Sequence, residues 1–176
     1  VSKNTALEYL LCYWNPLTSL DVSNNTALIE FECKSNQLTT LDVTKNTKLE
    51  VLDCSENQLT SLDLSNNTLL NRLACSSNNL SSLDLSNNTL LKRLYCSSNN
   101  LSSLDLSNNL NLNPTMSWYV DCSDNFYTVN IDKTFIFNLS SLPGEFDHTR
   151  MSIKSGNAVD KDGLLKVDES IGEDTI

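Results

Sequence analysis

Basic residues are scarce in this chain of 176 residues. Lysine and arginine together number 12, against 22 aspartates and glutamates, which gives a formal net charge of −10 and a sequence pI near 4.4. Nucleic acids and anionic membrane surfaces are bound mainly through clustered Lys and Arg, so the composition argues against both as partners. A cationic partner is easier to accept on the same grounds.

Long apolar runs are also missing. No stretch approaches the roughly 18 uninterrupted apolar residues of a membrane span, and no basic, apolar and small-residue leader opens the chain. We therefore expect no membrane insertion. Residues 1–7 already correspond to the middle of a repeat, so we expect the chain to be a fragment that begins inside a longer protein.

Histidine occurs once, as His148. A general-base role for His148 is the catalytic alternative, but no nucleophile motif surrounds it, and no convergent acid, base and nucleophile set occurs elsewhere. The sequence therefore predicts a protein that is not an enzyme and that needs no cofactor.

Repetition is what the sequence has in abundance. Six cysteines recur, five of them at intervals of 21 residues and the last after 26: Cys12, Cys33, Cys54, Cys75, Cys96 and Cys122. A leucine column that includes Leu70, Leu91 and Leu112 keeps the 21-residue period, so the longer interval indicates a five-residue insertion at about 113–117. This regularity predicts a stack of equivalent coils.

Each period contains two similar halves that share the pattern LxxLxLxxN, as in residues 91–101 and 101–110, with cysteine at the third leucine position of the first half. The alternating Leu-x-Cys of one half and Leu-Asp-Leu of the other predict two short strands per coil. An asparagine ends each half, where its amide can satisfy backbone groups at a turn. The predicted fold class is a β-rich solenoid, a right-handed coil with two short parallel sheets and a leucine core between them.

Units such as LTSLDVSNNTALIEFECKSNQ resemble the bacterial leucine-rich-repeat proteins with nested 21-residue repeats. The resemblance covers Val1 to about Asn125, and the segment 137–146 is similar to the region that follows such repeats in bacterial cell-surface proteins. It implies a leucine-rich-repeat solenoid that is displayed on the cell surface or secreted and that acts in adhesion or protein recognition. It names no ligand.

The 21-residue period fades after Asn125, and we predict two regions, a solenoid of about six coils at 1–125 and a C-terminal cap at 126–176. An apolar run at 135–142 and a turn signal at 160–163 followed by Leu164 and Leu165 predict strands in this cap. A turn is favoured at 160–163 over a calcium loop. The cap would cover the leucines and the open sheet edge of the last coil.

The cysteines occupy positions at which the other half-repeat has leucine or valine, so we predict six buried, reduced thiols. In-register strands would hold neighbouring Cβ atoms about 4.8 Å apart, wider than a disulfide prefers, and the close-spaced ligand pairs of zinc sites are missing. Disulfides and zinc remain the alternatives.

An aspartate recurs at an outward position of the second half, flanked by serine or threonine, at Asp21, Asp42, Asp63, Asp84 and Asp105. We predict a solvated structural column in which the hydroxyl groups offset the repulsion between carboxylates. The alternative is a calcium-binding face, but calcium prefers six to eight oxygens that converge from several directions. The prediction is therefore no metal site.

The cysteine half carries the candidate binding face, because its outward positions change from coil to coil while the aspartate column does not. Aromatic and Arg side chains often anchor protein interfaces. The predicted partner-binding residues are Tyr9, Leu11, Tyr13, Trp14, Glu30, Glu32, Asp53, Arg72, Arg93, Tyr95, Tyr119 and Asp121. We predict a protein partner of the host or bacterial surface; the rival class is a structural spacer with no ligand of its own. The sequence leaves the oligomeric state unknown.

Overall fold

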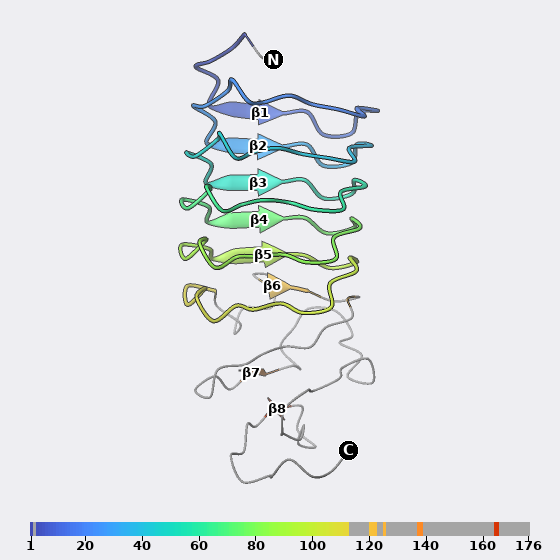
Figure 1. Ribbon diagram of the computed structural model, residues 1–176, viewed down its shortest axis with the longest axis vertical. Coiled ribbons are helices and arrows are strands. Elements are labelled where there is room, and N and C mark those ends of the chain that lie inside the picture. Colours follow the sequence, from blue (N-terminus) through green and yellow to red (C-terminus); the bar gives the residue numbers. More distant parts are fainter. Residues whose placement is uncertain (2, 113–119, 123–124, 126–136, 139–163, 166–176) are drawn as a thin grey trace.

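The computed structural model describes residues 1, 3–112, 120–122, 125, 137–138 and 164–165. Six short strands stack in chain order into one parallel sheet, and two more form a separate antiparallel pair (Figure 1). The strands are β1 (Tyr9–Leu11), β2 (Glu30–Glu32), β3 (Val51–Asp53), β4 (Arg72–Ala74), β5 (Arg93–Tyr95), β6 (Val120–Asp121), β7 (Phe137–Asn138) and β8 (Leu164–Leu165). No helix in these described stretches is long and apolar enough to cross a membrane.

The register of the sheet follows the sequence repeat. Tyr9 pairs with Glu30 across β1 and β2, so equivalent positions of successive coils lie side by side. β6 joins β5 through Leu94 and Val120, which takes up the five-residue insertion without breaking the parallel order. The predicted solenoid with a period of 21 residues is therefore confirmed.

A single apolar core runs through the stack. The middle residue of each of the three-residue strands β1 to β5 points inward, and Phe31, Leu52, Leu73 and Leu94 are all completely buried at this position. Leucines of the second half meet them from the opposite side of the coil, as Leu64 does. Because each coil shares its apolar residues with the coils above and below, the core is continuous rather than divided.

Two columns of buried asparagine join the coils. In the column that ends the strand half, Asn57 donates to the backbone carbonyl oxygens of Cys33 and Cys54 at 3.0 and 3.1 Å, and its Oδ1 accepts the Leu38 N–H at 3.0 Å. In the column that ends the aspartate half, Asn67 donates to two carbonyl oxygens. Each amide thus connects one coil to the coil before it.

The predicted second parallel sheet does not form within the described residues, where the aspartate half contributes no strand. Its aspartates instead accept hydrogen bonds from the backbone two residues ahead, as when the Ser65 N–H donates to Asp63 Oδ1 at 2.9 Å. The Ser86 N–H donates to Asp84 in the same way. These local bonds use backbone donors that a second ladder would need, so the chain turns there.

The cysteines form a column of free thiols, and five of the six are buried. The prediction that all are buried is wrong for Cys12, which is only partly covered because it lies in the first coil, with β2 on one side. Burial raises the pKa of the Cys33 and Cys54 thiols. The Cys96 and Cys122 sulfur atoms lie 3.0 Å apart as a thiol hydrogen bond.

Strand content predicted after residue 125 is confirmed at two places. β7 pairs antiparallel with β8, with Phe137 opposite Leu165 and Asn138 opposite Leu164. The rest of the predicted cap lies outside the described residues, so its boundaries and its role at the end of the solenoid stay predictions.

Candidate protein-binding face

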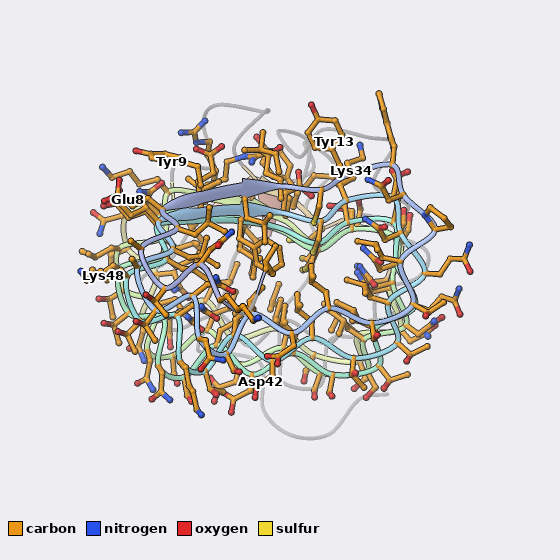
Figure 2. The ribbon with its side chains drawn as sticks, turned by 90° about the horizontal axis from the view of Figure 1, so that it is seen from above. Glu8, Tyr9, Tyr13, Lys34, Asp42 and Lys48 are labelled. Carbon is orange, nitrogen blue, oxygen red and sulfur yellow. The ribbon has the colours of Figure 1, made fainter. Side chains whose placement is uncertain are left out.

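The outward side chains of β1 to β6 and of the turn that follows β1 form the candidate site, which we call the strand face. Side chains alternate along a strand, so the first and third residues of β1 to β5 point away from the core. The two outward rows are Tyr9, Glu30, Val51, Arg72 and Arg93, and Leu11, Glu32, Asp53, Ala74, Tyr95 and Asp121. Viewed along the stack, Tyr9 and Tyr13 lie outside the sheet, and Asp42 lies on the opposite side of the coil (Figure 2).

The first coil presents large apolar side chains to solvent. Tyr9 and Leu11 are each more than half exposed, and Trp14 is 75% exposed. The rings of Tyr13 and Trp14 meet edge to face, with centroids 5.6 Å apart and an interplanar angle of 87°. Surface patches of exposed aromatic residues often mark interaction sites.

Trp14 also has an unusual backbone. Its φ angle is 54°, in the left-handed region, as is that of the equivalent residue in the next four coils, Ser35, Glu56, Ser77 and Ser98. This conformation is costly for a bulky residue. It is held here by the Trp14 N–H, which donates to the Lys34 carbonyl oxygen at 2.9 Å. The turn therefore fixes the direction in which Trp14 leaves the coil.

Arg72 organises the centre of the strand face. Its guanidinium donates to Asp53 at 3.3 Å, lies 3.8 Å from Glu32 and sits over the Tyr95 ring at 5.8 Å from the centroid. Asp53, predicted as an outward orienting charge, is buried, with 8% of its surface exposed, and its Oδ1 accepts the Ser55 N–H at 3.1 Å. The charges predicted to orient a partner are in part engaged with one another.

The acidic side chains beside Arg72 outnumber it. Burial raises the pKa of Glu32, and the negative charges of Asp53 and Glu30 raise it further, although Arg72 acts in the opposite direction. Glu30 and Glu32 are the two outward residues of β2. Burial is the largest cause of the raised pKa of Glu32 and the neighbouring carboxylates add to it, so the surroundings of this side chain disfavour its charged form.

A second charged network was missed from the sequence. Glu56 pairs with Lys34 at 3.1 Å and accepts a hydrogen bond from the Ser35 hydroxyl at 2.6 Å, across neighbouring coils. These contacts lower the pKa of Glu56, the Ser35 bond contributing most. The sequence did contain a signal for this pair, because Lys34 and Glu56 carry opposite charges and are separated by one 21-residue period plus one residue.

The remaining predicted residues differ in accessibility. Arg93 is exposed, whereas Tyr95 and Asp121 are half-buried at the end of the described sheet. Tyr119, predicted as an aromatic anchor, lies outside the described residues, as does His148. The structure therefore brings eleven of the twelve predicted residues onto one face and leaves Tyr119 untested.

Exposed leucines on the side of the coil were also missed. Leu69, Leu90 and Leu110 are 44%, 46% and 71% exposed in the connection that follows the aspartate half. Earlier coils carry Ala27 and Lys48 at the position of Leu69 and Leu90. Comparing equivalent positions of successive repeats would have revealed them.

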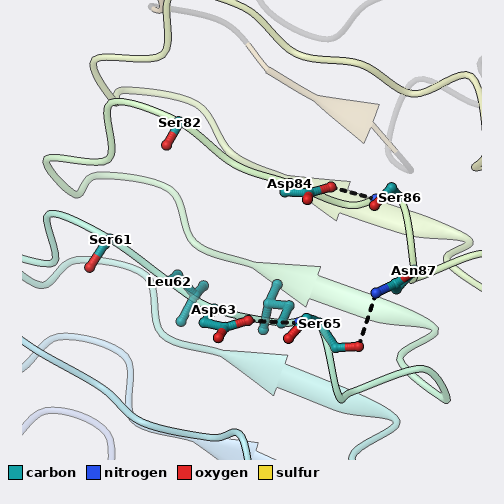
Figure 3. Close-up of a pocket in the computed structure, with 9 residues that line it drawn as sticks. Ser61, Leu62, Asp63, Ser65, Ser82, Asp84, Ser86 and Asn87 are labelled. Carbon is teal, nitrogen blue, oxygen red and sulfur yellow. Dashed lines mark hydrogen bonds between the residues drawn. The ribbon is translucent and has the colours of Figure 1, made fainter.

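The aspartate column lies on the face opposite the sheet. A shallow hollow of about 230 Å³ lies between two coils there and is lined by Ser61, Asp63, Ser65, Ser82, Asp84 and Ser86 (Figure 3). Hydrogen bonds from Ser65, the backbone bond first, hold the pKa of Asp63 below its usual range, although Asp42 and Asp84 act to raise it. At Asp63 the hydrogen bonds therefore outweigh the repulsion from neighbouring carboxylates. The backbone N–H of Ser65 contributes more than its hydroxyl group, which alone was predicted to do so.

Within the part of the chain that the structure describes, no group of three or more His, Cys, Asp or Glu side chains is arranged to hold a metal ion. The carboxylates of the column lie side by side, each engaged with its own turn. The hollow between Asp63 and Asp84 does not gather oxygens from several directions, as a calcium site does.

Fold and repeat together are those of a leucine-rich-repeat solenoid with a period of 21 residues, and the similar solved structures are bacterial leucine-rich-repeat proteins. Among solved structures the chain is similar to the functional domain of InlJ from Listeria monocytogenes, which includes a cysteine ladder, with 40% identity, a TM-score of 0.56 and coverage of 74% of this chain. It is also similar to an internalin, InlF, of the same organism, with 26% identity, a TM-score of 0.64 and coverage of 73%.

A leucine-rich-repeat protein of Leptospira interrogans matches at 21% identity over 73% of this chain, with a TM-score of 0.63, which shows the fold alone. The chain covers 33%, 37% and 34% of these three structures, so it corresponds to about a third of each. No protein-family profile and no curated protein matches the chain.

Proposed function

We propose that this chain is a protein-binding module and that its partner lies against the strand face. The observation that carries the proposal is the contrast between columns of one solenoid. The outward rows of the sheet contain aromatic, aliphatic, acidic and basic residues, while the aspartate column stays the same throughout. Positions that the coil itself does not require are free to encode a partner.

Accessibility supports the first coil as the anchor of this interface. Tyr9, Leu11 and Trp14 expose large apolar areas that contribute little to the core. Burying such side chains against a partner is the main source of binding free energy at protein interfaces. A spacer domain would have no use for them, so the exposed aromatic residues favour binding over a purely structural role.

The similar solved structures supply the biological setting of the proposal. The internalin neighbours favour a bacterial protein that is displayed on the surface or secreted and that recognises another protein, of the host or of bacteria. No catalytic role is proposed. Cell fractionation of the source organism, with the full-length protein detected in the cell-wall or medium fraction, would test the location.

The binding proposal is tested by pairing capture with face-specific variants. Surface proteins captured on the immobilised chain would be identified by mass spectrometry, and their affinities would be measured by surface plasmon resonance. Trp14→Ala and Tyr9→Ala should each weaken binding, by about thirtyfold where the residue is a hot spot. The control, Asp63→Asn with Asp84→Asn, alters the opposite face and should bind like the parent. Binding that depends on the aspartate column instead would refute the proposal.

A further inference from the structure

The two outward rows place apolar and acidic side chains next to each other at the start of the strand face. Tyr9 pairs in register with Glu30, and Leu11 pairs with Glu32. Neighbouring strands lie about 4.8 Å apart, so each exposed apolar side chain of β1 has a carboxylate of β2 as its immediate neighbour. This arrangement occurs at both outward positions of the strand pair.

Electrostatics make this part of the face negative. Three carboxylates, those of Glu30, Glu32 and Asp53, occupy outward positions of β2 and β3, and Arg72 pairs with only two of them, most closely with the buried Asp53. Glu32 lies farther from Arg72, at 3.8 Å, and Glu30 is drawn into no salt bridge among the residues described. The pair on β2 can therefore accept a further cation.

From this juxtaposition we propose that the partner presents a lysine or arginine side chain flanked by large apolar side chains, and that this segment docks across β1 and β2. The cation lies between Glu30 and Glu32, and its apolar neighbours pack on Tyr9 and Leu11. The cation can also lie over the ring of Tyr9 in a cation–π contact. The inference rests on the proposed function, because it names the chemistry that the strand face recognises.

Charge on the whole chain agrees with this partner. A net charge of −10 attracts a basic protein segment over distances of about 10 Å and repels anionic polymers and membranes. It also disfavours a second copy of this chain as the occupant. Long-range attraction acts mainly on the association rate, whereas the apolar contacts with Tyr9 and Leu11 hold the complex together.

A random peptide library displayed on phage and selected on the full 176-residue chain provides the test, since it presupposes no partner. Selected peptides should be enriched in Lys or Arg within two residues of an aromatic residue or leucine. Synthetic copies should bind a Glu30→Gln, Glu32→Gln double variant about tenfold more weakly than the parent. Both exchanges conserve shape, and melting curves would verify the fold.

The matched control is the Asp63→Asn, Asp84→Asn double variant, which removes the same charge from the opposite face. It should bind the peptides like the parent. Equal weakening in both double variants would mean unspecific attraction and would overturn the inference. Neutral peptides that lose affinity on Tyr9→Ala but not on the glutamate exchanges would overturn it as well, while leaving the proposed function standing.

Two further outcomes are decisive. A selection that yields no peptide dependent on the strand face counts against both the partner chemistry and the proposed function. A concentration-dependent dimer in sedimentation, abolished by Tyr9→Ala, would place a second copy of the chain on this face and overturn the inference.

Discussion

The two long faces of this solenoid are built from half-repeats of the same pattern, yet they use it differently. On the strand face, backbone groups pair between coils and the outward side chains vary. On the aspartate face, each carboxylate accepts the N–H of its own turn, and the side chains are uniform. Cross-coil pairing of the backbone leaves the outward side chains free to vary from coil to coil, whereas the local hydrogen bonds require the same aspartate in every coil.

The asparagine columns give the largest expected difference between the two faces. Asn57 makes three donor bonds and one acceptor bond, while Asn67 makes two donor bonds and its Oδ1 lacks a hydrogen-bond partner among the described residues. Asn57→Ala should lower the free energy of unfolding by about 3 kcal/mol or more, because it orphans several buried groups. Asn67→Ala should cost about 2 kcal/mol or less.

Urea unfolding followed by circular dichroism would measure both variants. The two residues lie in neighbouring halves of the stack and differ mainly in their bonds, so they are a matched pair. If both variants lose the same free energy of unfolding, the additional hydrogen bonds of Asn57 do not contribute to stability.

The cysteine column provides the next comparison, between buried and partly exposed members of one row. Cys54→Ser should destabilise the protein by about 2 kcal/mol, because it places a hydroxyl group in an apolar core, and Cys12→Ser should cost much less. In native protein a thiol reagent should label Cys12 alone, and burial raises its pKa, so labelling should begin at higher pH than for an exposed thiol.

Denaturation without reductant should release all six thiols for labelling. Mass spectrometry assigns the labelled sites. A disulfide in the native protein, or rapid native labelling of Cys54, would contradict the buried reduced column.

Lowering the pH should change the contributions of the two faces to protein stability in opposite directions. Asp63 has a lowered pKa, so its contribution to stability is present above the unfolded pKa of about 4 and is lost as the pH falls through the folded pKa. Glu32 has a raised pKa, so its ionisation opposes folding, and stability is gained as the pH falls through its folded pKa.

Glu32→Gln should therefore raise the melting temperature at pH 7, by no more than about 2 °C because solvent screens the group, and the gain should vanish near pH 4. Asp63→Asn should leave the protein less sensitive to acid than the parent. Melting curves of both variants between pH 3 and pH 7 would check these signs, and a destabilised Glu32→Gln variant at neutral pH would show that the Arg72 pair dominates.

Much of this architecture was predictable because the repeat constrains it. Inward residues that recur every 21 residues fix the register of the sheet. The same spacing predicted correctly that Cys33 and the cysteines of the following coils are buried. Alternation alone wrongly predicted a second parallel sheet, which the described residues do not form. Leu-Asp-Leu has the pattern of a strand, but the aspartate side chain accepts the N–H of its own turn instead. The burial of Asp53 was not predictable either, because the carboxylate accepts the N–H of Ser55 in its own turn and pairs with Arg72 of the following coil.

The smallest expected effect concerns metal removal from the aspartate face. Calcium needs six to eight oxygens from several directions, but Asp63 and Asp84 each direct Oδ1 toward the N–H of a serine two residues ahead. We expect EDTA to leave the melting temperature of the native protein unchanged, and calcium to leave it unchanged after EDTA has been removed by dialysis. The Asp63→Asn, Asp84→Asn variant, measured in parallel, separates a specific site from general screening of charge. A fall of many degrees with EDTA that calcium restores in the parent but not in this variant would make the aspartate column a binding face, and the division of roles between the two faces would no longer hold.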